Sequence, residues 1–235
     1  MTDPRDEEKA PATLTAENDA ATFVPVEQEP MHRQRWKSDT VRLVCVQFPM
    51  HTTCLWHQHL KYGVYICIQD LSAAEQPVGS DQRALVKSKG DVFCRDHSED
   101  KLIHVVHALD KPLFIIEVEL LKEKHLIAPH DDVPQHVARG VHCVNDSLEC
   151  RVYRLALLTL DTEEISLTLP TSAVLVALDE CVVTIFNPAK DSDMLADEKH
   201  LEPGDDITLV PGQFEIKLVA RDHPESVSFI LTEVF

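Results

Sequence analysis

The sequence predicts an all-β chain made of two similar domains. Most apolar residues fall in short runs that are rich in β-branched side chains and bounded by turn residues, such as VRLVCVQF, VYICIQDL and FIIEVELL. Runs of this kind are typical of strands, whereas the spacing that would place apolar residues on one helix face is scarce. The strand-like features also recur in the same order in both halves of the chain, which indicates a duplicated unit.

Composition limits what the protein could do. With 235 residues, of which 44% are hydrophobic, the chain can bury one large core or two smaller ones. The formal net charge of −18 argues against nucleic acid or an anionic membrane surface as a partner.

The cysteines and the N-terminus indicate a compartment. The seven cysteines are scattered and contain no CxxC pair, so neither a disulfide framework nor a zinc ribbon is predicted. The N-terminus has neither the basic nor the apolar segment of a signal peptide, and no stretch approaches the roughly 18 apolar residues that span a membrane. We therefore expect a cytoplasmic protein.

The segments follow one another in a simple order. Residues 1–22 are acidic, rich in Ala, Thr and Pro and without an apolar period, so we expect a disordered tail. Strand-like runs then fill residues 23–125, and a second series fills residues 138–235. The connector LIAPHDDVPQHVAR between them predicts a linker at residues 126–137.

The duplication can be traced along the chain. Residues 41–44 (VRLV) align with residues 150–153 (CRVY), and residues 64–70 (VYICIQD) align with residues 173–179 (AVLVALD), both at an offset of 109 residues and without a gap. Two later features also recur, at offsets of 114 and 115 residues: the Gly-Asp pairs at 90–91 and 204–205, and the terminal runs at 114–116 and 229–231. The drift falls in polar loops, which tolerate insertions.

Histidines cluster in the first half of the chain. His57 and His59 stand two apart in LWHQHLKY, and side chains at i and i+2 of a strand share a face, so both imidazoles can point at one spot. His104, in KLIHVVH, lies on a predicted strand of the same domain and could add a third nitrogen. Neutral imidazole is the commonest metal ligand, and three of them leave coordination positions open for water or substrate. An isolated HxH is more often an ordinary strand pair, but the offset of 109 puts Ser166 and Thr168 at these places, so the scaffold itself does not need imidazoles there.

These features resemble a known family. HxH on one strand, a Gly-Asp turn about 30 residues later and a single histidine on a further strand resemble the cupin superfamily, and two copies resemble a bicupin. The resemblance covers residues 23–235. It implies two tandem cupin-type double-stranded β-helix (jelly-roll) domains of the RmlC-like kind, with a metal ion inside the barrel.

The chain departs from the family motifs, which read roughly G(x)5HxH(x)3–4E(x)6G and G(x)5PxG(x)2H(x)3N. The glutamate of the first motif is absent, because Gly63 or Val64 stands in its place. The second motif matches with His104 as ligand if the loop CRDHSEDKLIH holds three extra residues, and His97 is the alternative. In the second half Ser166 and Thr168 replace HxH and Glu215 replaces the later histidine, so a metal-free domain that braces the first is predicted.

Further residues are candidates for roles around this site. Strand alternation points Tyr65 and Cys67 into the barrel, where Tyr65 could donate a proton or anchor a substrate, and core packing is the alternative for both. Arg95 could bind a substrate carboxylate. His107 follows His104 by three residues and should face away, in a supporting or structural role.

A three-histidine site without a carboxylate leaves the charge of the ion uncompensated in a low-dielectric barrel, so it should accept an anionic ligand. The resemblance implies a metal-dependent dioxygenase or isomerase that acts on a small anionic metabolite with a divalent Fe, Ni, Zn or Mn ion. A ligand-binding cupin without turnover and a metal-free structural protein are the alternatives. Cupins often dimerise through edge strands, so a homodimer is also considered.

Overall fold

A computed structural model describes residues 22–121, 130–157, 164–187, 198–219 and 226–235 of the chain. Strands dominate these residues, and the predicted all-β fold is confirmed. Within the described ranges the helical elements are two 3₁₀ turns, Val26–Gln28 and His130–Asp132, and no helix is long and apolar enough to cross a membrane. The predicted tail, except Thr22, and residues 126–129 of the predicted linker lie outside the described residues.

The first barrel consists of two five-stranded sheets, in the orders β1-β4-β9-β6-β7 and β2-β3-β10-β5-β8. Its strands are β1 (Val24–Pro25), β2 (His32–Lys37), β3 (Val41–Phe48), β4 (His57–Gln58), β5 (Tyr62–Cys67), β6 (Leu71–Pro77), β7 (Arg83–Lys87), β8 (Val92–Asp96), β9 (Ile103–Ala108) and β10 (Leu113–Leu120).

The second barrel repeats this plan with the sheets β11-β12-β19-β14-β17 and β13-β18-β15-β16. Its strands are β11 (Val141–Asp146), β12 (Cys150–Leu157), β13 (Glu164–Leu169), β14 (Ala173–Ala177), β15 (Cys181–Phe186), β16 (Glu198–Leu201), β17 (Asp206–Leu209), β18 (Gly212–Leu218) and β19 (Val227–Val234). Strands β2 to β10 therefore match β11 to β19 one by one, and the predicted duplication and pair of jelly rolls are confirmed.

The strand registers correct two parts of the predicted alignment. The terminal runs correspond at an offset of 114 residues instead of 115, because Ile116 and Ile230 lie in the same core. The second part concerns β5 and β14. The gap-free offset of 109 pairs Val64 with Ala173, but Val64 packs into the core between the barrels whereas Ala173 faces the inside of the second barrel. Val174, one residue further on, lies in the same core as Val64. A slip of one residue turns every side chain of a strand to the other face, so β5 and β14 correspond at an offset of 110 residues.

The same shift corrects the counterparts of the histidines. His57 faces His104 across the β4–β9 ladder, as Leu167 faces Phe214 across the β13–β18 ladder. Strand β6 pairs with β9 in the same register as β15 pairs with β18, once residues are matched at an offset of 110. At this offset His57 corresponds to Leu167, and His104 corresponds to Phe214. Leu167, Leu169 and Phe214 therefore replace the three histidines, and the predicted counterparts Ser166, Thr168 and Glu215 are wrong by one residue.

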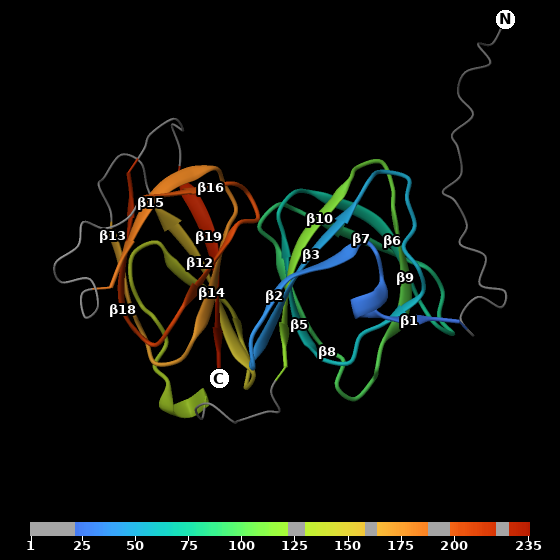
Figure 1. The fold of residues 1–235 in the computed structure, drawn as a ribbon, viewed down its shortest axis with the longest axis horizontal. Coiled ribbons are helices and arrows are strands. Elements are labelled where there is room, and N and C mark those ends of the chain that lie inside the picture. Colours follow the sequence, from blue (N-terminus) through green and yellow to red (C-terminus); the bar gives the residue numbers. More distant parts are fainter. Residues whose placement is uncertain (1–21, 122–129, 158–163, 188–197, 220–225) are drawn as a thin grey trace, which may run out of the picture.

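The barrels pack together through one sheet of each. Figure 1 shows them side by side, with β2, β3, β5 and β10 of the first against β12, β14 and β19 of the second. The interdomain core contains the fully buried Ile66, Ile116, Val152, Val176 and Ile230. One sheet of each barrel is therefore buried against the other.

The repeated Gly-Asp turns have a role at this junction. Gly90 and Gly204 adopt φ values of +79° and +90°, a region that favours glycine. Arg35 of the first barrel donates to the carbonyl of Gly204 at 2.7 Å, and Arg154 of the second barrel donates to the carbonyl of Gly90. Each turn therefore accepts an arginine from the opposite barrel.

We expect Gly204→Ala to destabilise the chain by about 2–4 kcal/mol, because a Cβ at φ +90° would lie 2.5 Å from a ring carbon of Phe114. Gly79→Ala is the control: φ is +71° there, but no heavy atom lies within 4 Å of the added Cβ, so a loss of about 1 kcal/mol is expected. Urea unfolding at neutral pH measures both free energies. Equal losses would mean that the contact with Phe114 costs nothing.

Candidate metal centre

Three of the candidate imidazoles meet inside the first barrel. His57 and His59 share a face at the β4 edge, and His104 of β9 lies directly opposite His57. The Nε2 atom of His57 lies 3.1 Å from Nε2 of His59 and 3.0 Å from Nε2 of His104. All three side chains are buried, with exposed fractions of 0%, 2% and 7%.

The hydrogen bonds behind the rings fix where their protons lie. The Nδ1–H group of His57 donates to the carbonyl of Leu55 at 2.8 Å, and that of His104 donates to the carboxylate of Glu75 at 2.7 Å. Neither acceptor can donate, so the neutral rings carry lone pairs on Nε2. These lone pairs face each other at 3.0 Å, an arrangement that a cation between them would stabilise.

The spacing also fits a metal ion. Imidazole nitrogens bind first-row divalent ions at about 2.0–2.1 Å, and two ligands at about 90° would then lie about 3.0 Å apart, as in an octahedral shell. Burial, together with the neighbouring His104 ring, holds the pKa of His57 well below its usual value. Burial lowers the pKa of His104 to about 4, although the bond to Glu75 opposes this shift. The rings of His57 and His104 are thus in the neutral form that metals require at pH 7.

A fourth imidazole, which sequence reasoning missed, completes this cluster. The ring of His32, on β2, lies 4.5 Å from that of His57. One ring nitrogen from each of His32, His57 and His59 lies within 4.8 Å of those of the other two. Glu29 accepts from Nδ1 of His32 at 2.7 Å, so Nε2 is again the free nitrogen. Nothing in the local sequence HRQRWK marks this histidine, because no second ligand-type residue accompanies it.

Two buried carboxylates, also missed from the sequence, support the rings. Glu75 of β6 is fully buried and accepts from Arg83 at 2.9 Å and from Arg95 at 2.6 Å as well as from His104. Burial would raise the pKa of Glu75, but its interactions with His104 and Arg95 outweigh this effect and hold the pKa well below the usual value. The guanidinium of Arg95, predicted to bind a substrate carboxylate, is thus bonded to a carboxylate of the protein.

Glu117 of β10 supports His59 in a similar position. Its Oε1 lies 3.4 Å from Nδ1 of His59, and its side chain is fully buried. Burial would raise the pKa of Glu117, but its interaction with the neighbouring His59 ring outweighs this effect and lowers the pKa to about 2. The sequence gave no signal for either glutamate, because nothing in it placed β6 and β10 beside the histidines.

The structure places the other predicted residues around this cluster. Tyr65 points inward, with its hydroxyl 3.4 Å from Nδ1 of His59, and burial raises its pKa well above the usual value, so it stays protonated. The ring of His97 lies 5.6 Å from that of His59, and Nδ1 of His97 donates to Asp100 at 3.0 Å. Cys67 also faces the core of the first barrel, and burial raises its pKa to about 12.

His107 lies apart from the other rings. On β9 it stands three residues beyond His104, and its Nδ1 is 2.7 Å from the hydroxyl of Thr53. This position agrees with the supporting or structural role expected for it.

The cluster borders a small cavity of about 40 Å³. A cavity needs about 10–15 Å³ of such space to hold one water molecule, so this cavity holds about three molecules of that size in this conformation. Its wall is mostly apolar. The lining residues are His32, Val46, Phe48, His59, Tyr65, Glu75, Leu85, Phe93, Arg95, His104, Val106, Leu113 and Ile115.

The second barrel fills the matching positions with apolar side chains. The residues that replace His32, His57, His59, Tyr65, His104 and Glu117 are Val141, Leu167, Leu169, Leu175, Phe214 and Leu231, all in its core. A different polar pair is kept in both barrels: Arg42 faces Glu119, with Nε and Oε2 2.7 Å apart, and Arg151 faces Glu233 in the same register. The second barrel keeps this Arg–Glu register, although Arg151 there bonds to Asp146 and Glu233 lies 3.4 Å from His136. The histidine cluster is an addition to the first barrel.

Comparison with known proteins supports the fold. No protein-family model matches the sequence, and neither does a curated protein. Among solved structures, AerE from Microcystis aeruginosa is similar with a TM-score of 0.57 and 9% identity over 88% of this chain and 98% of AerE. The oxalate decarboxylase of Lactobacillus farciminis, in a formate complex, gives 0.55 and 10% over 86% and 84%. A salicylate 1,2-dioxygenase from Pseudoaminobacter salicylatoxidans, with gentisate, gives 0.54 and 12% over 83% and 69%.

A cupin 2 conserved barrel protein from Leptotrichia buccalis is also similar, with a TM-score of 0.52 and 11% identity over 86% of this chain and 88% of that one. The chain therefore has the fold of a bicupin, as the predicted resemblance implied. In its first barrel, His32, His57 and His59 lie close enough together to hold a divalent metal ion, and His104 lies beside His57.

Proposed function

We propose that the first barrel binds a divalent metal ion through His57, His59 and His104, with His32 as a fourth imidazole, and uses it to act on a small anionic ligand. The converging Nε2 lone pairs carry this proposal, together with their replacement by leucine and phenylalanine in the second barrel. Bound there, a divalent Fe, Ni, Zn or Mn ion would supply a Lewis acid and, for a redox metal, oxygen chemistry.

The surrounding residues favour an anionic ligand. Glu29 and Glu75 bond to the Nδ1 side of their histidines, so the negative charges of the protein lie behind the rings and leave the Nε2 side without a carboxylate bonded to it. Tyr65 keeps its proton and lies beside His59, so its hydroxyl can donate to a bound anion or to a leaving atom. These roles suit a dioxygenase or isomerase.

The size of the cavity favours a second candidate, a cupin that binds a ligand without turnover. A volume of about 40 Å³ admits a ligand of two or three heavy atoms in this conformation, whereas aromatic substrates need a larger pocket. The scattered free cysteines favour a reducing compartment, so the proposal includes a cytoplasmic location. It also includes a homodimer that forms through edge strands.

Metal analysis of protein purified without added ions tests the proposal. We expect about one equivalent per chain, and His104→Ala should lower the metal content to background. His107→Ala is the matched control, because it removes a histidine of the same strand that bonds to Thr53 instead. Equal metal content in wild type and His104→Ala would overturn the site. Oxygen uptake by the Fe(II)-loaded protein with thiols, diketones and dihydroxy aromatics then separates an oxygenase from a binder.

His32→Val should weaken metal binding by about 10–100-fold, the loss expected for one supporting partner of a metal site. Valine is the residue at the matching position 141 of the second barrel, so the barrel should fold. Competition with a chelator of known affinity measures the change. An unchanged affinity would show that His32 packs beside the site without contributing a ligand.

A further inference from the structure

A second cavity, of about 320 Å³, opens at one end of the junction between the barrels, and we call it the junction pocket. The first barrel contributes the start of β5, the end of β10 and the loop after β8, and the second barrel contributes the turn before β12 and the end of β19. The lining residues are Thr40, Lys61, Tyr62, Asp96, Ser98, Glu99, Leu120, Glu149, Val234 and Phe235. The junction pocket shares no lining residue with the cavity beside the histidines. Its size and its place between two domains are typical of sites for small molecules.

The loop after β8 is longer than its counterpart in the second barrel. Residues 97–102 join β8 to β9, whereas residues 210–211 join the matching strands β17 and β18. The longer loop brings Ser98 and Glu99 to the junction pocket. Its start is fixed by Asp96, whose Oδ1 accepts from the backbone N–H of Ser98 at 2.9 Å and from the Ser98 hydroxyl at 2.6 Å. The duplicated scaffold does not need the extra residues, which favours a role for them at the pocket.

The floor of the junction pocket is apolar. Leu120 and Val234 are buried and belong to the interdomain core, and the ring of Tyr62 packs against the same core. Phe235 is buried as well, and its backbone N–H donates to the carbonyl of Glu149 at 3.1 Å. Two aromatic rings and two aliphatic side chains therefore offer a concave surface on which the apolar part of a ligand can lie.

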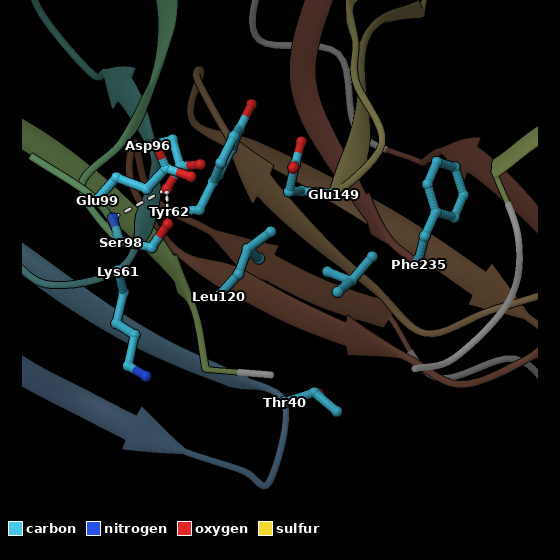
Figure 2. A pocket seen from close by; sticks show the side chains of 10 residues that line it. Thr40, Lys61, Tyr62, Asp96, Ser98, Glu99, Leu120, Glu149 and Phe235 are labelled. Carbon is cyan, nitrogen blue, oxygen red and sulfur yellow. Dashed lines mark hydrogen bonds between the residues drawn. The ribbon is translucent and has the colours of Figure 1, made fainter. Parts of the chain in front are cut away.

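The charges around this floor are mostly negative. Three carboxylates, those of Asp96, Glu99 and Glu149, line the pocket together with one cation, Lys61. Figure 2 shows the side chain of Lys61 directed away from the three carboxylates. The formal net charge of the whole chain, −18, adds a field that attracts cations. A positively charged ligand therefore complements the pocket.

The spacing of the carboxylates favours an organic cation over a metal ion. Among the residues that the structure describes, the group of three ligand-type side chains whose atoms all lie within 4.8 Å of one another is the histidine group of the first barrel. Asp96, Glu99 and Glu149 do not form such a group, so they are too dispersed to surround one small ion. An ammonium group on an organic body is larger and can bond to carboxylates on different sides.

We propose that the junction pocket binds a small organic cation, an amine with an aromatic or aliphatic body. The body lies on Leu120 and Phe235, and the ammonium group bonds to the carboxylates of Asp96 and Glu149. Charge-assisted hydrogen bonds of this kind are stronger than neutral ones, and the face of Tyr62 also attracts a cation. Because residues of both barrels contact the ligand, binding stabilises their association. The inference is independent of the proposed metal site, which lies in the interior of the first barrel.

A series of three probes with one body and different charges tests the proposal. The probes are 2-phenylethylamine, which is a cation at pH 7, the neutral 2-phenylethanol and the anionic 3-phenylpropionate. The full-length protein is first freed of metal with a chelator, so that the amine cannot coordinate an ion. Isothermal titration should give a Kd below about 1 mM for the amine and values at least about 10-fold higher for the other two, which lack the charge-assisted bonds. Equal affinities, or tightest binding of the carboxylate, would overturn the proposal.

Variants connect this preference to the pocket. Asp96→Asn combined with Glu149→Gln keeps the shape of both side chains and removes their charge, so binding of the amine should weaken by about 10-fold or more while binding of the alcohol stays unchanged. Asp81→Asn is the matched control, because it removes an exposed carboxylate in the loop between β6 and β7. An amine affinity that is the same in the double variant as in the control would contradict the assignment.

Methyl NMR of the wild type locates the amine independently of any substitution. Resonances of Leu120 and Val234, which line the junction pocket, should shift as 2-phenylethylamine is added, whereas those of Val46 and Leu113, which line the cavity beside the histidines, should not. The opposite pattern would place the amine inside the first barrel and would overturn the proposal.

Discussion

Replacing His57 and His59 together by leucine should abolish metal binding and leave the first barrel folded. Leucine occupies the matching positions 167 and 169 of the second barrel, inside an apolar core of the same architecture. Loss of two imidazole ligands should lower metal affinity by at least about 1000-fold, since structural metal sites of four ligands bind with about 10–16 kcal/mol. The free energy of unfolding of the metal-free protein should change by no more than about 2 kcal/mol.

Gln58→Leu is the matched control for the double variant. Gln58 stands between the two histidines, and its side chain points to the other face of β4, where it donates to the carbonyl of Lys101 at 3.5 Å. The control should bind metal as the wild type does. Isothermal titration of each metal-free protein with Zn²⁺ measures the affinities, and urea unfolding measures the stabilities. Retention of a tight site in the double variant would move the ligand set to other groups, such as His97 and Glu117.

Strand periodicity explains why so much of the fold could be predicted. Short β-branched runs, turn residues and the recurrence of VRLV as CRVY follow from local chemistry that a strand requires wherever it lies. Register does not follow in this way. The second barrel has one more residue between β12 and β14 than the first has between β3 and β5, which shifts the offset from 109 to 110. Only the faces to which side chains such as Val64 and Val174 point reveal this shift.

The candidate site was predictable to the extent that its residues stand in a pattern. His57 and His59 have the i, i+2 spacing of one strand face, and His104 lies on the partner strand. His32 and Glu75 have no such pattern: each is a single polar residue on a strand, and they join the cluster only because β2 and β6 close the same barrel. Contacts of this kind depend on how sheets curve, and a linear sequence does not contain that information.

Glu75→Gln should weaken metal binding and destabilise the protein, because Glu75 is the acceptor on which His104, Arg83 and Arg95 converge. The amide keeps the shape of the carboxylate but not its charge. It should lower metal affinity by about 10–100-fold, as other changes to the partner of a metal-binding histidine do. The loss of stability should be about 2–3 kcal/mol, less than for a fully buried ion pair, because Arg83 and Arg95 are partly exposed and water can solvate them.

The pH dependence of stability separates the charge of Glu75 from its packing. The pKa of Glu75 is lowered in the folded state from a usual value of 4.5, so the unfolded chain binds the proton first. The stabilisation from this carboxylate is therefore present above about pH 4.5 and is lost as the pH falls below it. The pKa of His104 is lowered from 6.5 to about 4 by folding, so this residue also makes stability decrease as the pH falls, between about pH 6.5 and 4.

Urea unfolding of metal-free protein between pH 7 and pH 3 measures both contributions. Wild type and Glu75→Gln should lose stability in parallel between about pH 6.5 and 4.5, and the variant should show the shallower fall below pH 4.5 because it has no carboxyl to protonate at this position. Glu99→Gln, which changes an exposed glutamate of the loop after β8, should follow the wild type throughout. Parallel curves for Glu75→Gln and wild type below pH 4.5 would mean that Glu75 is protonated in the folded protein, and that His104 is held by a neutral acid instead of a carboxylate.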